Sequence, residues 1–255
     1  SIEPLRWAAE QVLDSSVTVT TLVPRGGNPE TYEPTATEMM RVAGAKMFIH
    51  TGGLGFERAW TERLQANAPH TEFVSLGHET HAEGCTHEGH SHEGEGCEGT
   101  GHSHSHDPHI WTSPRGMQAI VDKIQGATFS LCQGNAQGRQ RAEAAIHRAD
   151  SLLRTIAPGT AFAIYHPSLT QLADDYGLVQ VCIESDGKEP APAQLAATID
   201  RCREKGVKVV FVQEEFDDRA TRQIAAQLPA RVVRINPLGY DWPAETEKIV
   251  EALKE

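Results

Sequence analysis

Strand-like and helix-like segments alternate in two separate blocks, and this pattern constrains the fold of the chain most. In the first block, β-branched and apolar runs predict strands, and apolar residues at helical spacing predict helices. In chain order these segments are 3–13 (helix), 17–23 (strand), 35–44 (helix), 46–50 (strand), 56–67 (helix) and 72–76 (strand). Strands that alternate with helices form mostly parallel sheets covered by helices, so this block predicts one α/β lobe.

The second block repeats the alternation after a stretch with only helical patterns. Two helical segments there, near 115–131 and 136–156, are separated by Gln133-Gly134-Asn135, and such a helix can bridge two lobes. Strand patterns then alternate with helical ones: strands at 161–165, 179–183, 207–212 and 231–235, and helices near 168–176, 191–204 and 217–227. The prediction is an α/β fold of two similar lobes with mostly parallel sheets, divided as residues 1–132, a bridging helix at 133–157, and residues 158–255.

Residues 78–107 interrupt the first lobe with a very different composition. They hold eight histidines and seven acidic residues among Gly and Ser, with no Lys, no Arg and no large apolar side chain, so they cannot pack a core. Neutral imidazoles beside carboxylates are donors for borderline-soft divalent ions, and we expect an auxiliary metal-collecting loop rather than a purification tag or a neutral linker. Its histidines are His78, His81, His87, His90, His92, His102, His104 and His106.

The charge and composition exclude several classes of partner. The net charge is −12, which disfavours nucleic acid and anionic lipid surfaces and suits a cationic ligand. No apolar run approaches the roughly 18–20 residues needed to cross a bilayer. No leader-like segment precedes Ile2, so we expect any signal or lipoprotein segment to lie outside this sequence. Five cysteines leave at least one unpaired within the chain, and Cys85 and Cys97 are either a loop disulfide or a pair of metal thiolates.

A selective metal site needs ligands on rigid elements, and four side chains lie near the ends of predicted strands or beside the insertion. These candidates are Glu30, His50, His109 and His166. Open α/β sheets bind ligands at the carboxyl ends of their strands, so a site with members from both blocks would be a cleft between the lobes. Each of these histidines, taken alone, is more often a hydrogen-bonded structural residue. His70 and His147 have the pattern of surface residues, while Glu214 and Glu215 either line the cleft or cap the following helix.

Motifs along almost the entire chain add a more specific prediction. They are LVPRGGNPETYEPTATEM (22–39), GLGFE (53–57), DPHIWTSP (107–114), YHPSLTQLADDYGL (165–178), EPAPAQLAATI (189–199), FVQEEF (211–216) and INPLG (235–239). With these motifs the chain resembles the zinc and manganese cluster of ABC-transporter solute-binding proteins, of the zinc-uptake periplasmic type. The resemblance implies two α/β lobes tied by a long rigid helix, with Zn²⁺ held in the cleft between them. It also implies a periplasmic or cell-surface location and an ABC permease as partner, and we expect a monomer that binds no nucleic acid.

The resemblance also implies which residues hold the metal. His109 in DPHIW and His166 in YHPS match two histidine ligands of the family. Glu30 stands where the family has a further histidine, and a carboxylate can take that place on Zn²⁺. Asn236 stands where many members have an acidic ligand, so the fourth position is open to His50, Asp241, Asn236, a loop histidine or water.

Two other classes of function compete with this interpretation. A hydrolase also needs two or three His or Glu ligands and a water on zinc, but no HExxH motif occurs in the sequence. A metal-storage protein or metallochaperone would act mainly through the His-rich loop. We therefore predict a non-enzymatic solute-binding protein for zinc import, with storage or metallochaperone activity as the alternative.

Overall fold

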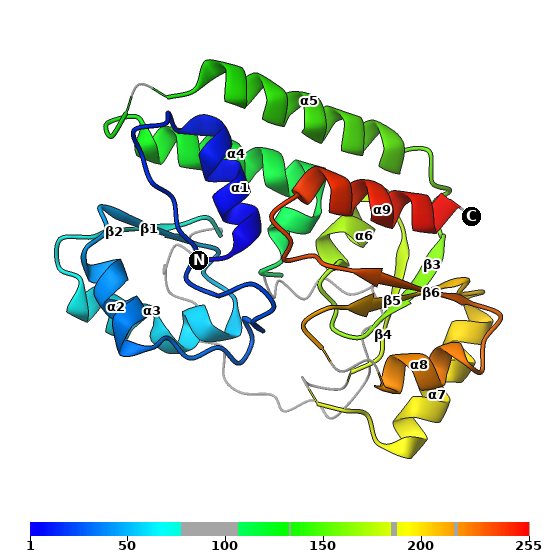
Figure 1. Cartoon of the computed structure of the whole chain (residues 1–255). Helices are drawn as coiled ribbons and strands as arrows, with labels where there is room; N and C mark the ends of the chain where they lie inside the picture. The colour runs from blue at the N-terminus through cyan, green and yellow to red at the C-terminus, as the bar shows by residue number, and fades with distance from the viewer. Residues whose placement is uncertain (78–106, 133, 185–187, 217–218, 255) are drawn as a thin grey trace, which may run out of the picture.

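The computed structural model describes residues 1–77, 107–132, 134–184, 188–216 and 219–254. The chain forms two α/β lobes side by side, with helices running across the top of both (Figure 1). The predicted fold class is therefore confirmed. The eight histidines of the predicted collecting loop, together with Cys85 and Cys97, lie outside the described residues.

The first lobe contains a small parallel sheet. Strands β1 (Met47–His50) and β2 (Glu72–Ser75) pair in register from Met47↔Glu72 to His50↔Ser75. Helices α1 (Glu3–Val12), α2 (Ala36–Ala43) and α3 (Gly55–Asn67) belong to the same lobe. Helix α2 begins with a capping box, because Thr35 accepts from the Glu38 backbone N–H and the Glu38 carboxylate accepts from the Thr35 N–H.

The predicted strand at 17–23 was wrong, because the structure gives these residues no ladder partner. The main chain of Ser1 lies between this segment and β1. Its carbonyl accepts from the N–H groups of Leu22 and Val23, and its amino group donates to the carbonyl of Ile49. Both segments line a cavity of about 440 Å³. The β-branched pattern was correct for extended chain, but it could not specify a partner.

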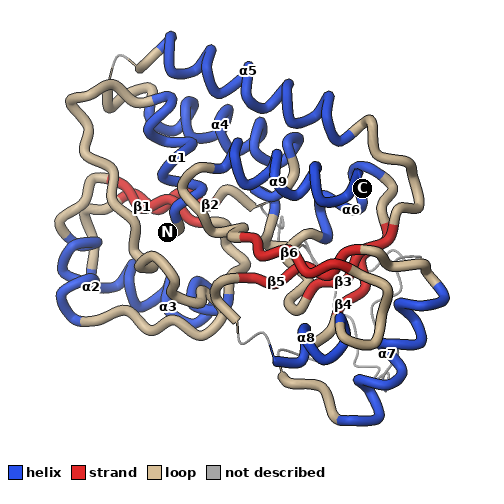
Figure 2. Tube along the Cα trace, turned by 45° about the vertical axis from the view of Figure 1, so that its right-hand side comes forward, coloured by secondary structure: helices blue, strands red, loops and turns tan. Residues whose placement is uncertain are grey.

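Helices connect the lobes. A short 3-10 helix, η1 (Ile110–Thr112), leads into α4 (Pro114–Thr128), and α5 (Ala136–Leu153) runs back over it. The Asn135 side chain caps α5 by accepting from the Gly138 N–H at 2.9 Å. Helix α5 packs against α1 and α4 at one end of the molecule and against α9 (Trp242–Lys254) at the other, so it bridges the two lobes (Figure 2).

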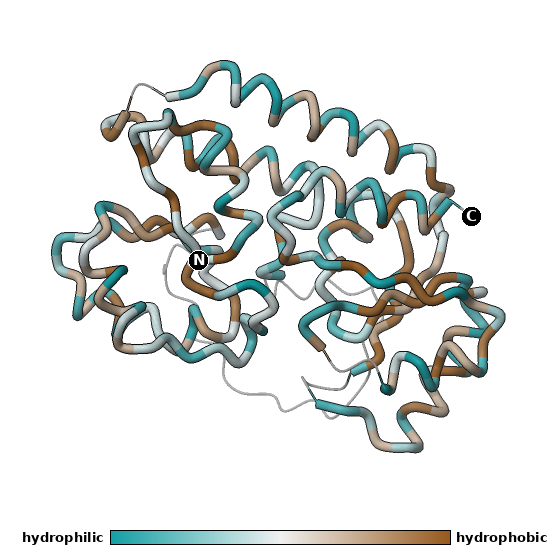
Figure 3. Tube along the Cα trace, viewed as in Figure 1, coloured by the Kyte–Doolittle hydropathy of each residue, from teal (hydrophilic) through white to brown (hydrophobic). Residues whose placement is uncertain are grey.

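The second lobe holds a four-stranded parallel sheet in the order β4-β3-β5-β6. Its strands are β3 (Ala161–Ile164), β4 (Val179–Cys182), β5 (Val209–Gln213) and β6 (Arg231–Ile235), and its remaining helices are α6 (Thr170–Tyr176), α7 (Pro192–Glu204) and α8 (Arg219–Ala225). Every residue of β3 and β5 is buried, as expected for central parallel strands covered on both faces. These strands are the most hydrophobic part of the lobe (Figure 3).

Buried tryptophans join the lobes beside the cleft. The indole N–H of Trp111 donates to the carbonyl of Pro237 at 2.8 Å, and the indole N–H of Trp242 donates to the carbonyl of Trp111 at 2.6 Å. Trp242 also packs on Trp7 of α1, with ring centroids 5.4 Å apart. These contacts place η1 against the loop after β6. In the described part of the chain, no helix is long and apolar enough to cross a membrane.

Candidate metal centre

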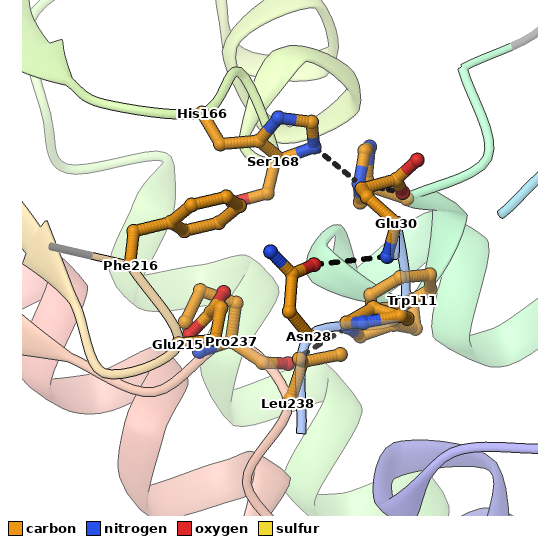
Figure 4. Close-up of a pocket in the computed structure, with 11 residues that line it drawn as sticks. Asn28, Glu30, Trp111, His166, Ser168, Glu215, Phe216, Pro237 and Leu238 are labelled. Carbon is orange, nitrogen blue, oxygen red and sulfur yellow. Dashed lines mark hydrogen bonds and ion pairs between the residues drawn. The ribbon is translucent and has the colours of Figure 1, made fainter. Parts of the chain in front are cut away.

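Three side chains from different parts of the chain converge between the lobes. Glu30 comes from the loop before α2, His109 directly precedes η1, and His166 lies two residues beyond β3. One potential ligand atom from each lies within 4.8 Å of the others, and no second group of this kind occurs among the described residues. Figure 4 shows the imidazole of His166 pointing toward Glu30. The structure therefore brings three of the four predicted strand-end residues together.

A carboxylate orients the ring of His109. The Nδ1 of His109 lies 2.7 Å from Oδ1 of Asp107, and the same oxygen accepts from the His109 backbone N–H at 3.0 Å. The other oxygen of Asp107 accepts from the backbone N–H of Gln171 in the second lobe, also at 3.0 Å. His109 is thus buried with Nδ1 occupied and Nε2 facing the cleft.

His166 is oriented in the same way. Its Nδ1 lies 3.0 Å from Oε1 of Glu184, and its backbone N–H donates to Oε1 of Gln213 at 2.9 Å. The ring of Phe216 stacks on the imidazole, with centroids 5.2 Å apart. Burial lowers the pKa of His166, but the hydrogen bond to Glu184 and the charges of Glu184, Glu30 and Glu215 outweigh it and raise the pKa above 6.5.

The two imidazoles face each other through the nitrogens that remain. The Nε2 atoms of His109 and His166 are 3.1 Å apart. Because both Nδ1 atoms lie against carboxylates, the neutral rings carry their protons on Nδ1, and both Nε2 atoms present lone pairs. Two ligands at about 2.0–2.1 Å from a tetrahedral Zn²⁺ lie about 3.3 Å apart, close to the observed separation. Either a proton on one Nε2 or a cation bound by both can occupy this position, so metal and proton should compete for it.

Glu30 adds a negative charge to this pair. Its Oε1 lies 4.0 Å from Nε2 of His109, is buried, and has no hydrogen-bond partner among the described residues. Its Oε2 accepts from the Gly55 N–H at 3.1 Å and lies 3.7 Å from the Arg58 guanidinium. Buried carboxylate oxygens are normally paired, so Oε1 of Glu30 is available to bind a cation.

Gly55 allows the Glu30 loop to approach α3 closely. A Cβ at this position would lie 2.8 Å from the Cα of Glu30, which is closer than real side chains come to a backbone. The loop itself turns on Asn28, whose side-chain oxygen accepts from the Glu30 backbone N–H at 2.9 Å (Figure 4).

The cavity at this centre is very small. Its volume is about 10 Å³, and its walls include Glu30, His109, His166, Trp111 and Glu215. That volume is roughly one water-sized sphere. The space therefore suits a single ion rather than an organic substrate.

The structure does not bring the other predicted candidates into this group. The buried His50 stacks on Phe48 with centroids 5.8 Å apart, and burial, opposed by the charge of Glu57, lowers its pKa. The side-chain amide of Asn236 donates to Glu214 at 2.9 Å, and Asp241 accepts from a backbone N–H at the start of α9. None of His50, Asn236 and Asp241 lines the cavity.

Three further residues at the centre were not predicted as partners of the ligands. Asp107 and Glu184 hold the Nδ1 atoms, and Gln213 holds the main chain of His166. A signal was present, since Asp107 lies in the DPH motif and Glu184 and Gln213 lie at the carboxyl ends of strands β4 and β5. The sequence pattern could not predict these hydrogen bonds, because they depend on the orientation of the two imidazole rings.

Two α/β lobes joined by helices, with two imidazoles and a carboxylate between them, define this chain as a solute-binding protein of the metal-binding class. A model of the family "Zinc-uptake complex component A periplasmic", ZnuA, matches residues 1–255, and the chain belongs to this family. It is therefore a zinc-binding periplasmic component of zinc uptake, and its family is one of transport proteins rather than enzymes.

Known relatives agree with this assignment. The chain is 28% identical over 248 residues to the high-affinity zinc uptake system protein ZnuA of Bacillus subtilis, covering 92% of this chain and 76% of that protein. It is 24% identical to the zinc-binding lipoprotein AdcA of Streptococcus pneumoniae, covering 99% of this chain but only 54% of AdcA. A crystal structure of ZnuA superimposes with a TM-score of 0.80 at 27% identity, over 99% of this chain and 96% of that one. A zinc-bound ZnuA lacking residues 138–173 of its own numbering has a TM-score of 0.79 at 28% identity.

Proposed function

We propose that the chain captures Zn²⁺ as cargo in the cleft, with His109, His166 and Glu30 as ligands, and delivers it to an ABC permease for high-affinity import. The observation that carries this proposal is the 3.1 Å approach of the Nε2 atoms of His109 and His166 beside a buried carboxylate oxygen of Glu30 that has no hydrogen-bond partner among the described residues. Imidazole nitrogens and a carboxylate oxygen are the usual protein ligands of zinc. Capture by an extracytoplasmic protein fits the family and the names of its relatives.

The ligand proposal is tested by zinc titration of single variants, with the metal-free protein and a competing chelator. We expect His166→Ala and His109→Ala to lose the high-affinity site, and His147→Ala, an exposed residue of α5, to keep it. Far-ultraviolet circular dichroism should show the same fold in all three variants. Unchanged affinity and stoichiometry in His166→Ala would exclude the cleft as the zinc site.

The His-rich segment forms the second part of the proposal, as an auxiliary collector that raises the amount of metal near the cleft. Closing a polar segment around an ion costs about 1–2 kcal/mol per residue ordered, so each such site should be weak. Deletion of residues 78–106 should lower the number of weakly bound zinc ions and leave the tight site intact. Loss of the tight site on deletion would instead favour the storage or metallochaperone alternative.

Delivery is tested by uptake. Cells that lack their own zinc-binding subunit and carry the cognate permease should import zinc at scarce supply when given the wild-type chain. The His109→Ala chain should not restore import. Equal import with both chains would contradict a role of the cleft in delivery.

A further inference from the structure

Glu215 is a second carboxylate in the wall of the metal cavity. It lies two residues beyond β5, at the carboxyl edge of the second-lobe sheet, and it lines the same cavity as Glu30, His109 and His166. Figure 4 shows its side chain beside Pro237, below the ring of Phe216. Of the two roles expected for it from the sequence, lining the cleft is the one that the described residues show.

The carboxylate of Glu215 has little compensation for its burial. Its Oε2 is buried without a hydrogen-bond partner among the described residues, and its Oε1 accepts from Nε2 of Gln213 at 3.3 Å. Glu30 is the other residue of the cavity with a buried, unpaired carboxylate oxygen. Two such oxygens around one small cavity are costly unless something positive binds there.

Gln213 connects Glu215 to the proposed ligand His166. The side-chain oxygen of Gln213 accepts from the backbone N–H of His166, and its amide nitrogen donates to Ser168 at 3.0 Å and to Glu215. Burial raises the pKa of Glu215 to about 7, while the charge of His166 acts in the opposite direction. Gln213 therefore contacts both His166 and Glu215 at the wall of the cavity.

The other candidates for a fourth protein ligand are engaged elsewhere. The Asn236 amide is hydrogen-bonded to Glu214, and Asp241 is exposed at the start of α9. Neither lines the cavity, whereas Glu215 does. Among the described residues, Glu215 is thus the carboxylate best placed to complete the set.

We propose that Glu215 supplies the fourth protein ligand, so that the cargo is held by two imidazoles and two carboxylates. This inference rests on the proposed function of the cleft. Glu215 lies outside the three-residue group of Glu30, His109 and His166, so the proposal requires its side chain to move closer to them when it binds the ion. Carboxylates suit Mn²⁺ better than imidazoles do, so a second carboxylate should weaken the discrimination of Zn²⁺ from Mn²⁺.

The test compares Glu215→Gln with the matched control Glu214→Gln, an exposed neighbour outside the cavity. Zinc and manganese affinities are measured by chelator competition, and Co²⁺ is used as a spectroscopic probe, because its visible absorption reports the number and geometry of ligands. Loss of an outer partner costs about 10–100-fold in metal affinity, so loss of a ligand should weaken zinc binding at least about tenfold. Glu215→Gln should also raise the ratio of zinc to manganese affinity and change the Co²⁺ spectrum, while Glu214→Gln should change neither.

Other outcomes overturn the inference in distinguishable ways. Unchanged zinc affinity and Co²⁺ spectrum in Glu215→Gln, together with lost binding in His166→Ala, would refute the fourth ligand and leave the cleft intact. Weaker zinc binding with an unchanged Co²⁺ spectrum would make Glu215 a positioning residue instead. Retained binding in His166→Ala would refute the cleft, and the fourth ligand with it.

Discussion

Replacing Glu215 by Gln should stabilise the metal-free protein at alkaline pH. Burial raises the pKa of this carboxyl from 4.5 to about 7, so the folded protein favours its neutral form. The stability that the neutral group contributes is complete below pH 4.5 and is lost as pH rises through 7. The difference between the two pKa values corresponds to about 3 kcal/mol at pH 8 and about 1 kcal/mol at pH 5.

A neutral amide does not ionise, so Glu215→Gln should recover up to about 3 kcal/mol at pH 8. For a chain of this size that is roughly 6–12 °C in Tm, measured by scanning calorimetry after removal of metal with a chelator. The gain should shrink to a few degrees at pH 5, and Glu214→Gln should show no such pH dependence. An equal gain at both pH values, or none at pH 8, would refute the argument that a desolvated charge destabilises the empty cleft. With saturating zinc the advantage of the variant should shrink, because binding stabilises only the folded state and a tenfold weaker affinity removes about 1.4 kcal/mol of it.

Three further predictions concern the partners of the ligands. Zinc affinity should fall as pH drops, beginning above pH 6.5, because the raised pKa of His166 lets protons compete with zinc for Nε2 near neutrality. In Glu184→Gln, chelator-competition titrations should show the loss of zinc affinity beginning at a lower pH, because this variant lacks the carboxylate that raises the pKa of His166. Asp107→Asn should weaken zinc binding about 10–100-fold, because it removes the carboxylate that orients a ligand ring, and full affinity in this variant would contradict that role. Gly55→Ala should weaken zinc binding by pushing the backbone of Glu30 away, which a crystal structure of the variant would show as a displaced loop.

Much of the fold was predictable from two sequence signals. Buried parallel strands appear as short apolar runs, and the helices that cover them show apolar residues at helical spacing. The runs that became β3 and β5 are mostly apolar, and in the structure every residue of both strands, including Gln213, is buried. The failure at 17–23 has a specific cause. Strand pairing needs a partner at hydrogen-bond distance, and the main chain of Ser1 takes that place beside β1.

The candidate site was predictable where a side chain follows a strand or stands in a specific motif. Glu30, His109 and His166 met that condition, and the structure brings them together, although their role as ligands stays a prediction. His50 met it too, but its ring packs in the core of the first lobe on Phe48. The sequence does not distinguish one histidine at a strand end from another. Whether the side chain becomes a ligand or a core residue depends on whether it points into the cleft or into the hydrophobic core, which only the structure shows.

The tryptophan hydrogen bonds across the lobes should oppose opening of the cleft. Opening the cleft widely would separate the indole of Trp111 from Pro237 and that of Trp242 from Trp111. Exchanging each buried hydrogen bond for water costs about 0.5–1.5 kcal/mol, so the pair reduces the open population by roughly 5- to 150-fold. If a bound ion leaves only from the open cleft, these hydrogen bonds would lengthen its residence time, and a partner that moves η1 away from the loop after β6 would shorten it without contacting a metal ligand.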